Sequence, residues 1–128
     1  MEIEPVREID FLADASLGEG TLSATVSGNA DLNVRLALDR FLNAVHREAH
    51  LHGVKEVTVD LRSLDFMNSS CLKSLVSWVT QIQDLPRPQQ YHVTFLSSPT
   101  LYWQKRSLHA LSCLANEIVT VSSDPVAS

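Results

Sequence analysis

One stretch near the middle of the chain decides the fold: Val57-Thr58-Val59-Asp60-Leu61-Arg62-Ser63-Leu64-Asp65-Phe66-Met67-Asn68-Ser69-Ser70-Cys71-Leu72. Apolar side chains alternate at Val57, Val59 and Leu61, which is the two-residue period of a β-strand. Val54 lies just before them. The pattern over 54–61 is therefore typical of a buried strand with helices around it.

The same stretch then predicts a loop over 62–67 and the start of a helix. Asn68, Ser69 and Ser70 have side chains that cap helices, because their oxygen atoms accept hydrogen bonds from unpaired backbone N–H groups. An apolar stripe at helical spacing follows and stops before Pro86, since proline cannot continue a helix. The stripe consists of Leu72, Leu75, Val76, Val79 and Ile82.

The residues before this stretch predict a hairpin and a helix. Apolar and β-branched runs between Ile9 and Gly28 flank a glycine turn at 18–20, which indicates two strands. Asp31 is the expected N-cap of the following helix, and Gly53 is expected to end it. The apolar face of this helix consists of Val34, Leu38, Phe41, Leu42, Val45 and Ala49.

The residues after it predict two more strands and a third helix. A strand is expected from Tyr91 to Leu96. Ser98-Pro99 combines a capping residue with a proline suited to the first helical position, so the third helix is expected to begin there and to end near Asn116. Residues 118–121, Ile-Val-Thr-Val, predict a last short strand.

The predicted order β-β-α-β-α-β-α-β defines an α/β fold class. It implies a mixed, mostly parallel sheet of about five strands with three main helices. The chain has 128 residues, of which 45% are hydrophobic, which suits one domain with its own core. We expect a single domain over 1–128, with a core from about 9 to 121 and a frayed tail at 122–128.

Charge and composition exclude several classes of protein. The net charge of −5 disfavours nucleic acid as a partner, because binding to phosphate requires a basic patch. Cys71 and Cys113 have no CxxC spacing and the N-terminus has no secretion signal, which favours a cytoplasmic location. No apolar stretch reaches the length of a membrane span, so we expect no direct membrane insertion.

The quoted stretch resembles the signature of the STAS domain of bacterial anti-sigma-factor antagonists. In that family a hydrophobic strand and a loop ending Phe-Met or Phe-Ile lead into Asp-Ser-Ser/Thr-Gly-Leu. Residues 26–31, Val-Ser-Gly-Asn-Ala-Asp, resemble the family's Ser-Gly-Glu-Leu-Asp, and Ser98-Pro99 falls where the family opens its third helix. The resemblance covers residues 20 to 121, approximately.

This resemblance implies a regulatory, protein-binding function in signal transduction. The partner would be a kinase-like anti-sigma factor that phosphorylates the chain, and the acceptor carried over by position is Ser69, with Ser70 as the weaker candidate. The partner-binding residues expected from it are Gly28, Asp31, Asn68, Ser69, Ser70 and Lys73, with the first two in a loop after the second strand. Two positions depart from the family: Asn68 replaces its aspartate and Cys71 its glycine.

Two other functions remain open from the sequence. The first is a STAS-like subunit of a transport complex, which would bind an ATPase or a transporter without phosphorylation; the departures at Asn68 and Cys71 favour it. The second is a hydrolase that uses Ser69 with a histidine. The sequence has no Gly-x-Ser-x-Gly elbow and no glycine-rich phosphate loop, so we expect neither an enzyme nor a cofactor.

Several other residues have ordinary structural interpretations. Serine is common at helix starts as a cap alone, and Cys71 and Cys113 are expected to be small buried hydrophobic residues. His46 and His50 have a spacing compatible with a metal but lack a clear third ligand, so they are expected on a solvated face without metal. The aromatic residues that belong either to the core or to an exposed interface are Trp78, Tyr102 and Trp103.

Overall fold

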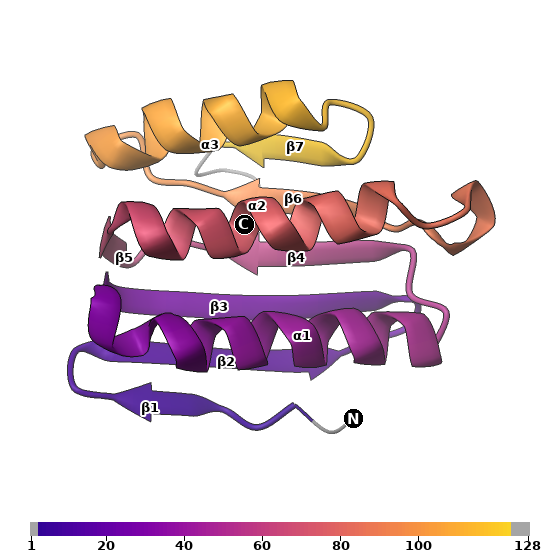
Figure 1. Cartoon of the computed structure of the whole chain (residues 1–128), viewed down its shortest axis with the longest axis horizontal. Coiled ribbons are helices and arrows are strands. Elements are labelled where there is room, and N and C mark those ends of the chain that lie inside the picture. Colours follow the sequence, from indigo (N-terminus) through magenta and orange to yellow (C-terminus); the bar gives the residue numbers. More distant parts are fainter. Residues whose placement is uncertain (1–2, 124–128) are drawn as a thin grey trace.

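The computed structural model describes residues 3–123, and its strands form one sheet beneath three helices (Figure 1). The strands are β1 (Val6–Glu8), β2 (Phe11–Leu17), β3 (Thr21–Ala30), β4 (Glu56–Asp60), β5 (Leu64–Met67), β6 (His92–Leu96) and β7 (Val119–Ser122). The helices are α1 (Arg35–Leu51), α2 (Ser69–Gln83) and α3 (Tyr102–Leu114), with 3₁₀ turns η1 (Leu32–Val34) and η2 (Arg87–Gln89).

The sheet runs in the order β1-β2-β3-β4-β6-β7, and β5 pairs with β3 beside this path. The first two pairings are antiparallel, whereas β3, β4, β6 and β7 are parallel neighbours. The helices α1, α2 and α3 connect these parallel strands in steps that all advance in one direction. Since such crossovers are right-handed, all three helices cover the same face of the sheet (Figure 1).

Burial along β3 agrees with this one-sided packing. Leu22, Ala24 and Val26 point to the helices and are buried, while Thr21 and Ser23 on the opposite face are exposed. The main apolar contributors to the core come from the sheet and all three helices: Phe11, Leu22, Leu38, Leu61, Leu64, Leu75, Ile82, Phe95, Leu108 and Leu111. The core therefore forms a single layer between the sheet and the helices.

The predicted α/β class, with a mixed, mostly parallel sheet and three main helices, is confirmed. The prediction of about five strands is wrong, because residues 3–123 already form a sheet of seven. The segment 62–67, predicted as a loop, contains β5. It forms a strand because the long β3 extends beyond β4 and offers unpaired backbone at Gly28 to Ala30, where β5 pairs. The other additional strand, β1, lies before residue 9 and is too short to show a period.

Two predicted helix starts shift in the structure. Asp31 accepts a hydrogen bond from Asn33 N, but it caps η1, and α1 begins only at Arg35. Ser98-Pro99 does not open α3, which begins at Tyr102. Instead, Leu101 N donates to Ser98 O at 3.2 Å, so the Ser-Pro pair forms a separate turn before the helix. The tail predicted as frayed falls outside the described residues from 124 onward, while Ser122 still belongs to β7.

A polar contact lies between the helices and the sheet. Trp78 Nε1–H of α2 donates to the Tyr91 hydroxyl at 2.9 Å, and the same hydroxyl lies 2.7 Å from His46 Nδ1 of α1. The tautomer of His46 decides whether its Nδ1 accepts the Tyr91 proton or donates to the Tyr91 hydroxyl oxygen. Burial lowers the pKa of His46, with a smaller contribution from His50.

This contact predicts a loss of stability in mild acid. A histidine whose pKa is lowered by folding binds fewer protons in the folded than in the unfolded chain, so stability falls as pH drops below the ordinary value near 6.5. Urea unfolding of the wild type and of His46→Gln between about pH 7.5 and 5 measures how the free energy of unfolding changes with pH. The variant should lose less free energy of unfolding over this range. Equal losses in the two proteins would show that His46 is not the source of the pH dependence.

Candidate functional site

The start of α2 is held in place by Asn68. Its side-chain oxygen accepts a hydrogen bond from Cys71 N at 2.8 Å, which makes it the N-cap predicted from the sequence. Asn68 N donates to Ala30 O at 2.9 Å, at the end of β3. The helix start is therefore attached both to its own first turn and to the sheet.

The two serines after the cap differ in exposure. Ser69 is exposed and Ser70 is half-buried. Lys73 lies four residues after Ser69, so it shares that helix face, and it is exposed as well. The helix start thus presents a hydroxyl and one ammonium group to solvent, beside backbone N–H groups that carry the positive end of the helix dipole.

Gly28 has a structural role, and the predicted loop around it does not exist. It lies inside β3 with a φ of +94°, and a Cβ there would come within 2.0 Å of Asp10 O. Asn29 N donates to the same Asp10 carbonyl at 2.6 Å. Gly28 therefore allows the turn between β1 and β2 to close against β3. Asp31, in contrast, is exposed directly after the strand, as expected of a surface residue.

Cys71, in the first turn of α2, contacts the backbone of Asp31. Its side chain is completely buried, and its Sγ lies 3.3 Å from Asp31 O. Burial raises the pKa of the Cys71 thiol, and the nearby Asp31 and Asp39 carboxylates raise it further. The thiol is therefore held in its neutral form, which agrees with the predicted role as a small buried residue.

A hollow of about 630 Å³ lies next to this site, and the sequence did not reveal it. Its wall combines apolar and acidic side chains from the β1–β2 turn, the end of β3, η1 and β5. Ile9 and Phe66 supply the exposed apolar surface. The acidic residues in its wall are Glu8, Asp10 and Asp31. No single segment of the sequence signals it, because its wall is assembled from separate segments.

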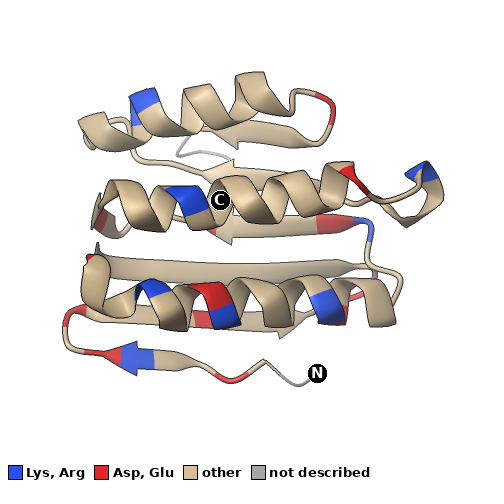
Figure 2. Cartoon of the chain, viewed as in Figure 1, with Lys and Arg blue, Asp and Glu red and all other residues tan. Residues whose placement is uncertain are grey.

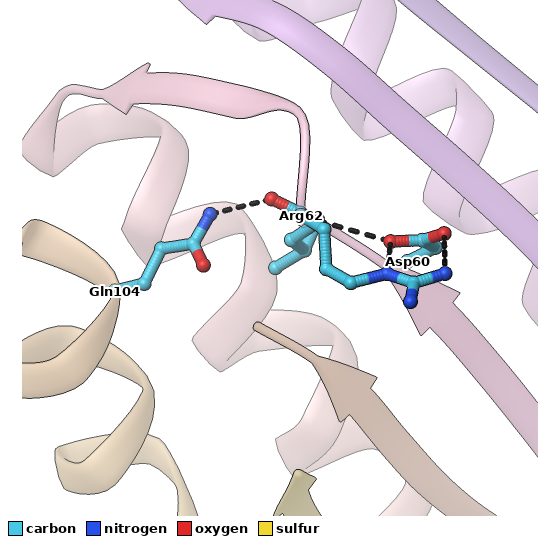
Figure 3. A network of polar contacts seen from close by, with 4 residues as sticks. Asp60, Arg62 and Gln104 are labelled. Carbon is cyan, nitrogen blue, oxygen red and sulfur yellow. Dashed lines mark hydrogen bonds and ion pairs between the residues drawn. The ribbon is translucent and has the colours of Figure 1, made fainter. Parts of the chain in front are cut away.

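The turn before β5 is held by the first turn of α3 (Figure 3). The fully buried Gln104 donates from Nε2 to Leu61 O and, at 3.1 Å, to Leu64 O, while its Oε1 accepts from Ser98 N at 2.7 Å. Trp103 Nε1–H also donates to Leu64 O at 3.1 Å. One buried amide therefore joins the two loops that lead into β5 and α3.

On the outer side of the same turn, Asp60 and Arg62 form a two-pronged ion pair (Figure 3). Arg62 Nε and Nη2 reach the two carboxylate oxygens at 3.0 and 2.9 Å, and Arg62 N donates to Asp60 Oδ1. These hydrogen bonds hold the pKa of Asp60 below its ordinary value. The pair fixes the direction in which the chain leaves β4.

Replacing Gln104 should destabilise the segment 62–67, which leads to the start of α2. Gln104→Leu removes one acceptor and two donors from a buried position, and we expect it to lower the free energy of unfolding by about 2 kcal/mol. Amide hydrogen exchange in residues 62–67 should also become faster. The matched control is Gln81→Leu, at an exposed position of α2, which should change stability by less than about 0.5 kcal/mol. Equal effects of the two substitutions would contradict the role of Gln104 in holding the turn before β5.

The remaining candidates lie away from the start of α2. Cys113 is exposed, which corrects its predicted burial: the buried side of α3 carries Gln104, Leu108 and Leu111, and Cys113 lies off this stripe. His46 is half-buried against Tyr91 instead of solvated, whereas His50 is exposed.

Within residues 3–123 no three potential ligands gather as a metal site, and no helix there has the length and hydropathy to cross a bilayer.

The aromatic residues divide between core and surface. Trp78 is buried, Trp103 is half-buried, and Tyr102 is almost fully exposed at the start of α3. Tyr102 is therefore the one of these three that meets the description of an exposed interface anchor.

Comparison of the sequence with protein-family models and with curated proteins gives no match. The structure is similar to the crystal structure of an anti-sigma factor antagonist from Mycobacterium paratuberculosis. The TM-score is 0.67 at 16% sequence identity, and the match covers 91% of this chain and 89% of the other. The chain therefore has a STAS-like fold, which confirms the fold expected from the sequence resemblance.

Proposed function

We propose that this protein is a regulatory, non-enzymatic module that binds a partner protein at the start of α2, and that phosphorylation of Ser69 controls this binding. The observation that carries the proposal is the exposure of Ser69 directly after the Asn68 cap, in a chain with a STAS-like fold. The similarity to an anti-sigma factor antagonist supports a kinase-like anti-sigma factor as the partner. A cytoplasmic location is part of the proposal.

The position of Ser69 suits a charge switch. A phosphate on the first residue of a helix lies beside unpaired N–H groups and the positive dipole end, so the fold tolerates it. Lys73 is the nearby exposed cation, while Asp31 and Asp65 are exposed carboxylates on the adjoining segments. The added charge of about −1.5 to −2 would have to be desolvated when a partner packs against this surface, which opposes docking.

The switch is tested with the purified chain and kinase-like anti-sigma factors in the presence of ATP. We expect phosphate on Ser69 by mass spectrometry, none in Ser69→Ala, and at least tenfold weaker binding of the phosphorylated protein, or about 1.4 kcal/mol. Ser77→Ala is the matched control, since this exposed serine of α2 lies two turns after Ser69, outside the expected partner-binding residues, and should leave both readouts unchanged. Binding that is insensitive to phosphate on Ser69 would refute the switch.

A second candidate is a subunit of a transport complex that binds an ATPase or a transporter without phosphorylation. Asn68 favours it, because an asparagine retains the cap but gives a kinase no carboxylate beside the serine. Co-purification of the chain with a transporter ATPase, together with an unmodified Ser69, would support this candidate over the first.

A further inference from the structure

The start of α2 lies at the middle of one end of the molecule. The carboxyl ends of β3, β5 and β6 face this end, as do the β1–β2 turn and the start of α3 (Figure 1). With neighbouring strands about 4.8 Å apart, the end is about 24 Å wide from β1 to β7. We call it the end surface and define it by the β1–β2 turn, residues 31–32, residues 65–73 and the first turns of α3.

Large apolar side chains are exposed across the end surface. The exposed fractions are 93% for Ile9, 66% for Leu32, 47% for Phe66 and 87% for Tyr102. Side chains of this size can bury on the order of 500 Å² together, and each partner of a standard protein interface buries about 800 Å². Ile9 and Phe66 line the same hollow, and large exposed apolar side chains gathered at one end of a small protein favour an interaction site there.

Charge is unevenly distributed along the same surface: in Figure 2 the β1–β2 turn is red with one blue band beside it on β1, and a blue band lies in the first half of α3. The acidic residues Glu8 and Asp10 lie at the β1–β2 turn, whereas Lys105 and Arg106 lie in the first half of α3. Residues 85–116 contain no Asp or Glu at all. Within the described part of the chain, these four side chains take part in no ion pair. Glu8 and Asp10 outnumber the exposed Arg7 of β1 at the first end, so that end is acidic by excess. The α3 end is basic, and the four side chains are available for ion pairs with another molecule.

Such a surface is complementary to itself. When two copies meet about a two-fold axis that passes near the start of α2, the basic end of each faces the acidic end of the other. In this arrangement the end of the surface that carries Tyr102 meets the end that carries the hollow between Ile9 and Phe66. That hollow, of about 630 Å³, is large enough to receive a phenol ring. Each contact is made twice by symmetry.

We propose that the chain forms a symmetric dimer through the end surface, with Tyr102 in the partner copy's hollow and Lys105 and Arg106 against its Glu8 and Asp10. The dimer covers the start of α2, including Ser69. Self-association therefore competes with partner docking where the proposed function holds, but the dimer itself does not depend on that function.

The test is sedimentation of the purified chain alone from about 1 to 500 µM, at low and high salt. The wild type should form dimers that are weakened by salt. Lys105→Glu with Arg106→Glu should weaken the dimer at least tenfold, and so should Tyr102→Ala. The matched control is Arg40→Glu with Arg87→Glu, which makes the same charge change at exposed positions outside the end surface and should retain the dimer.

A complementary variant makes the test specific. Glu8→Lys with Asp10→Asn reverses the acidic end; asparagine is chosen because Asp10 has a φ of 59°, which asparagine tolerates well. This variant alone should also lose the dimer, and mixing it with the Lys105→Glu, Arg106→Glu variant should restore a heterodimer. A wild type that stays monomeric throughout, or a mixture that fails to associate, would overturn the proposal. Neither result bears on phosphorylation of Ser69.

Discussion

The ten-residue strand β3 extends past its neighbour β4, and the position of the candidate site depends on this difference in length. β4 pairs with β3 only between Thr21 and Thr25. The backbone of β3 beyond this point would lack partners on one side, and β5 supplies them from Gly28 to Ala30. Since β5 ends next to Asn68, and Asn68 N donates to Ala30 O, the end of β3 determines where α2 begins.

This arrangement requires a tight turn between β4 and β5, whose carbonyl groups lie away from solvent. Gln104 satisfies Leu61 O and Leu64 O from α3, and Trp103 contributes a second donor to Leu64 O. An unsatisfied buried carbonyl costs about 1–3 kcal/mol. Helix α3 therefore stabilises the turn between β4 and β5, although α3 comes much later in the chain. The start of α3 and the start of α2 are thereby fixed relative to each other, together with the exposed Tyr102.

The sequence was sufficient for the regular elements and for the cap. Within the described residues, sequence patterns located all three helices and the strands β2, β3, β4, β6 and β7, and the capping chemistry of Asn68 placed the start of α2 at the correct residue. These features depend on local spacing, which a single sequence displays. The class of fold followed from their order alone.

The features that were missed depend on contacts between distant residues. β5 is a strand only because β3 has unpaired backbone beside it, and Gly28 looked like a loop glycine although it makes room for the Asp10 carbonyl. Gln104 carried no signal, since an amide in an amphipathic helix is normally solvated. The hollow beside Phe66 is assembled from four separate segments, so no one segment could predict it.

The distribution of charge on the end surface restricts what can bind there. The chain has a net charge of −5, so two copies repel each other at long range, and only contacts in the correct orientation offset this repulsion. A partner protein at the proposed site would meet the same restriction, because it would have to be basic opposite Glu8 and Asp10 and acidic opposite Lys105 and Arg106. Ser69 lies between these two ends. A phosphate there leaves both charged ends unchanged but must be desolvated in either complex, so one modification can oppose self-association and partner docking alike.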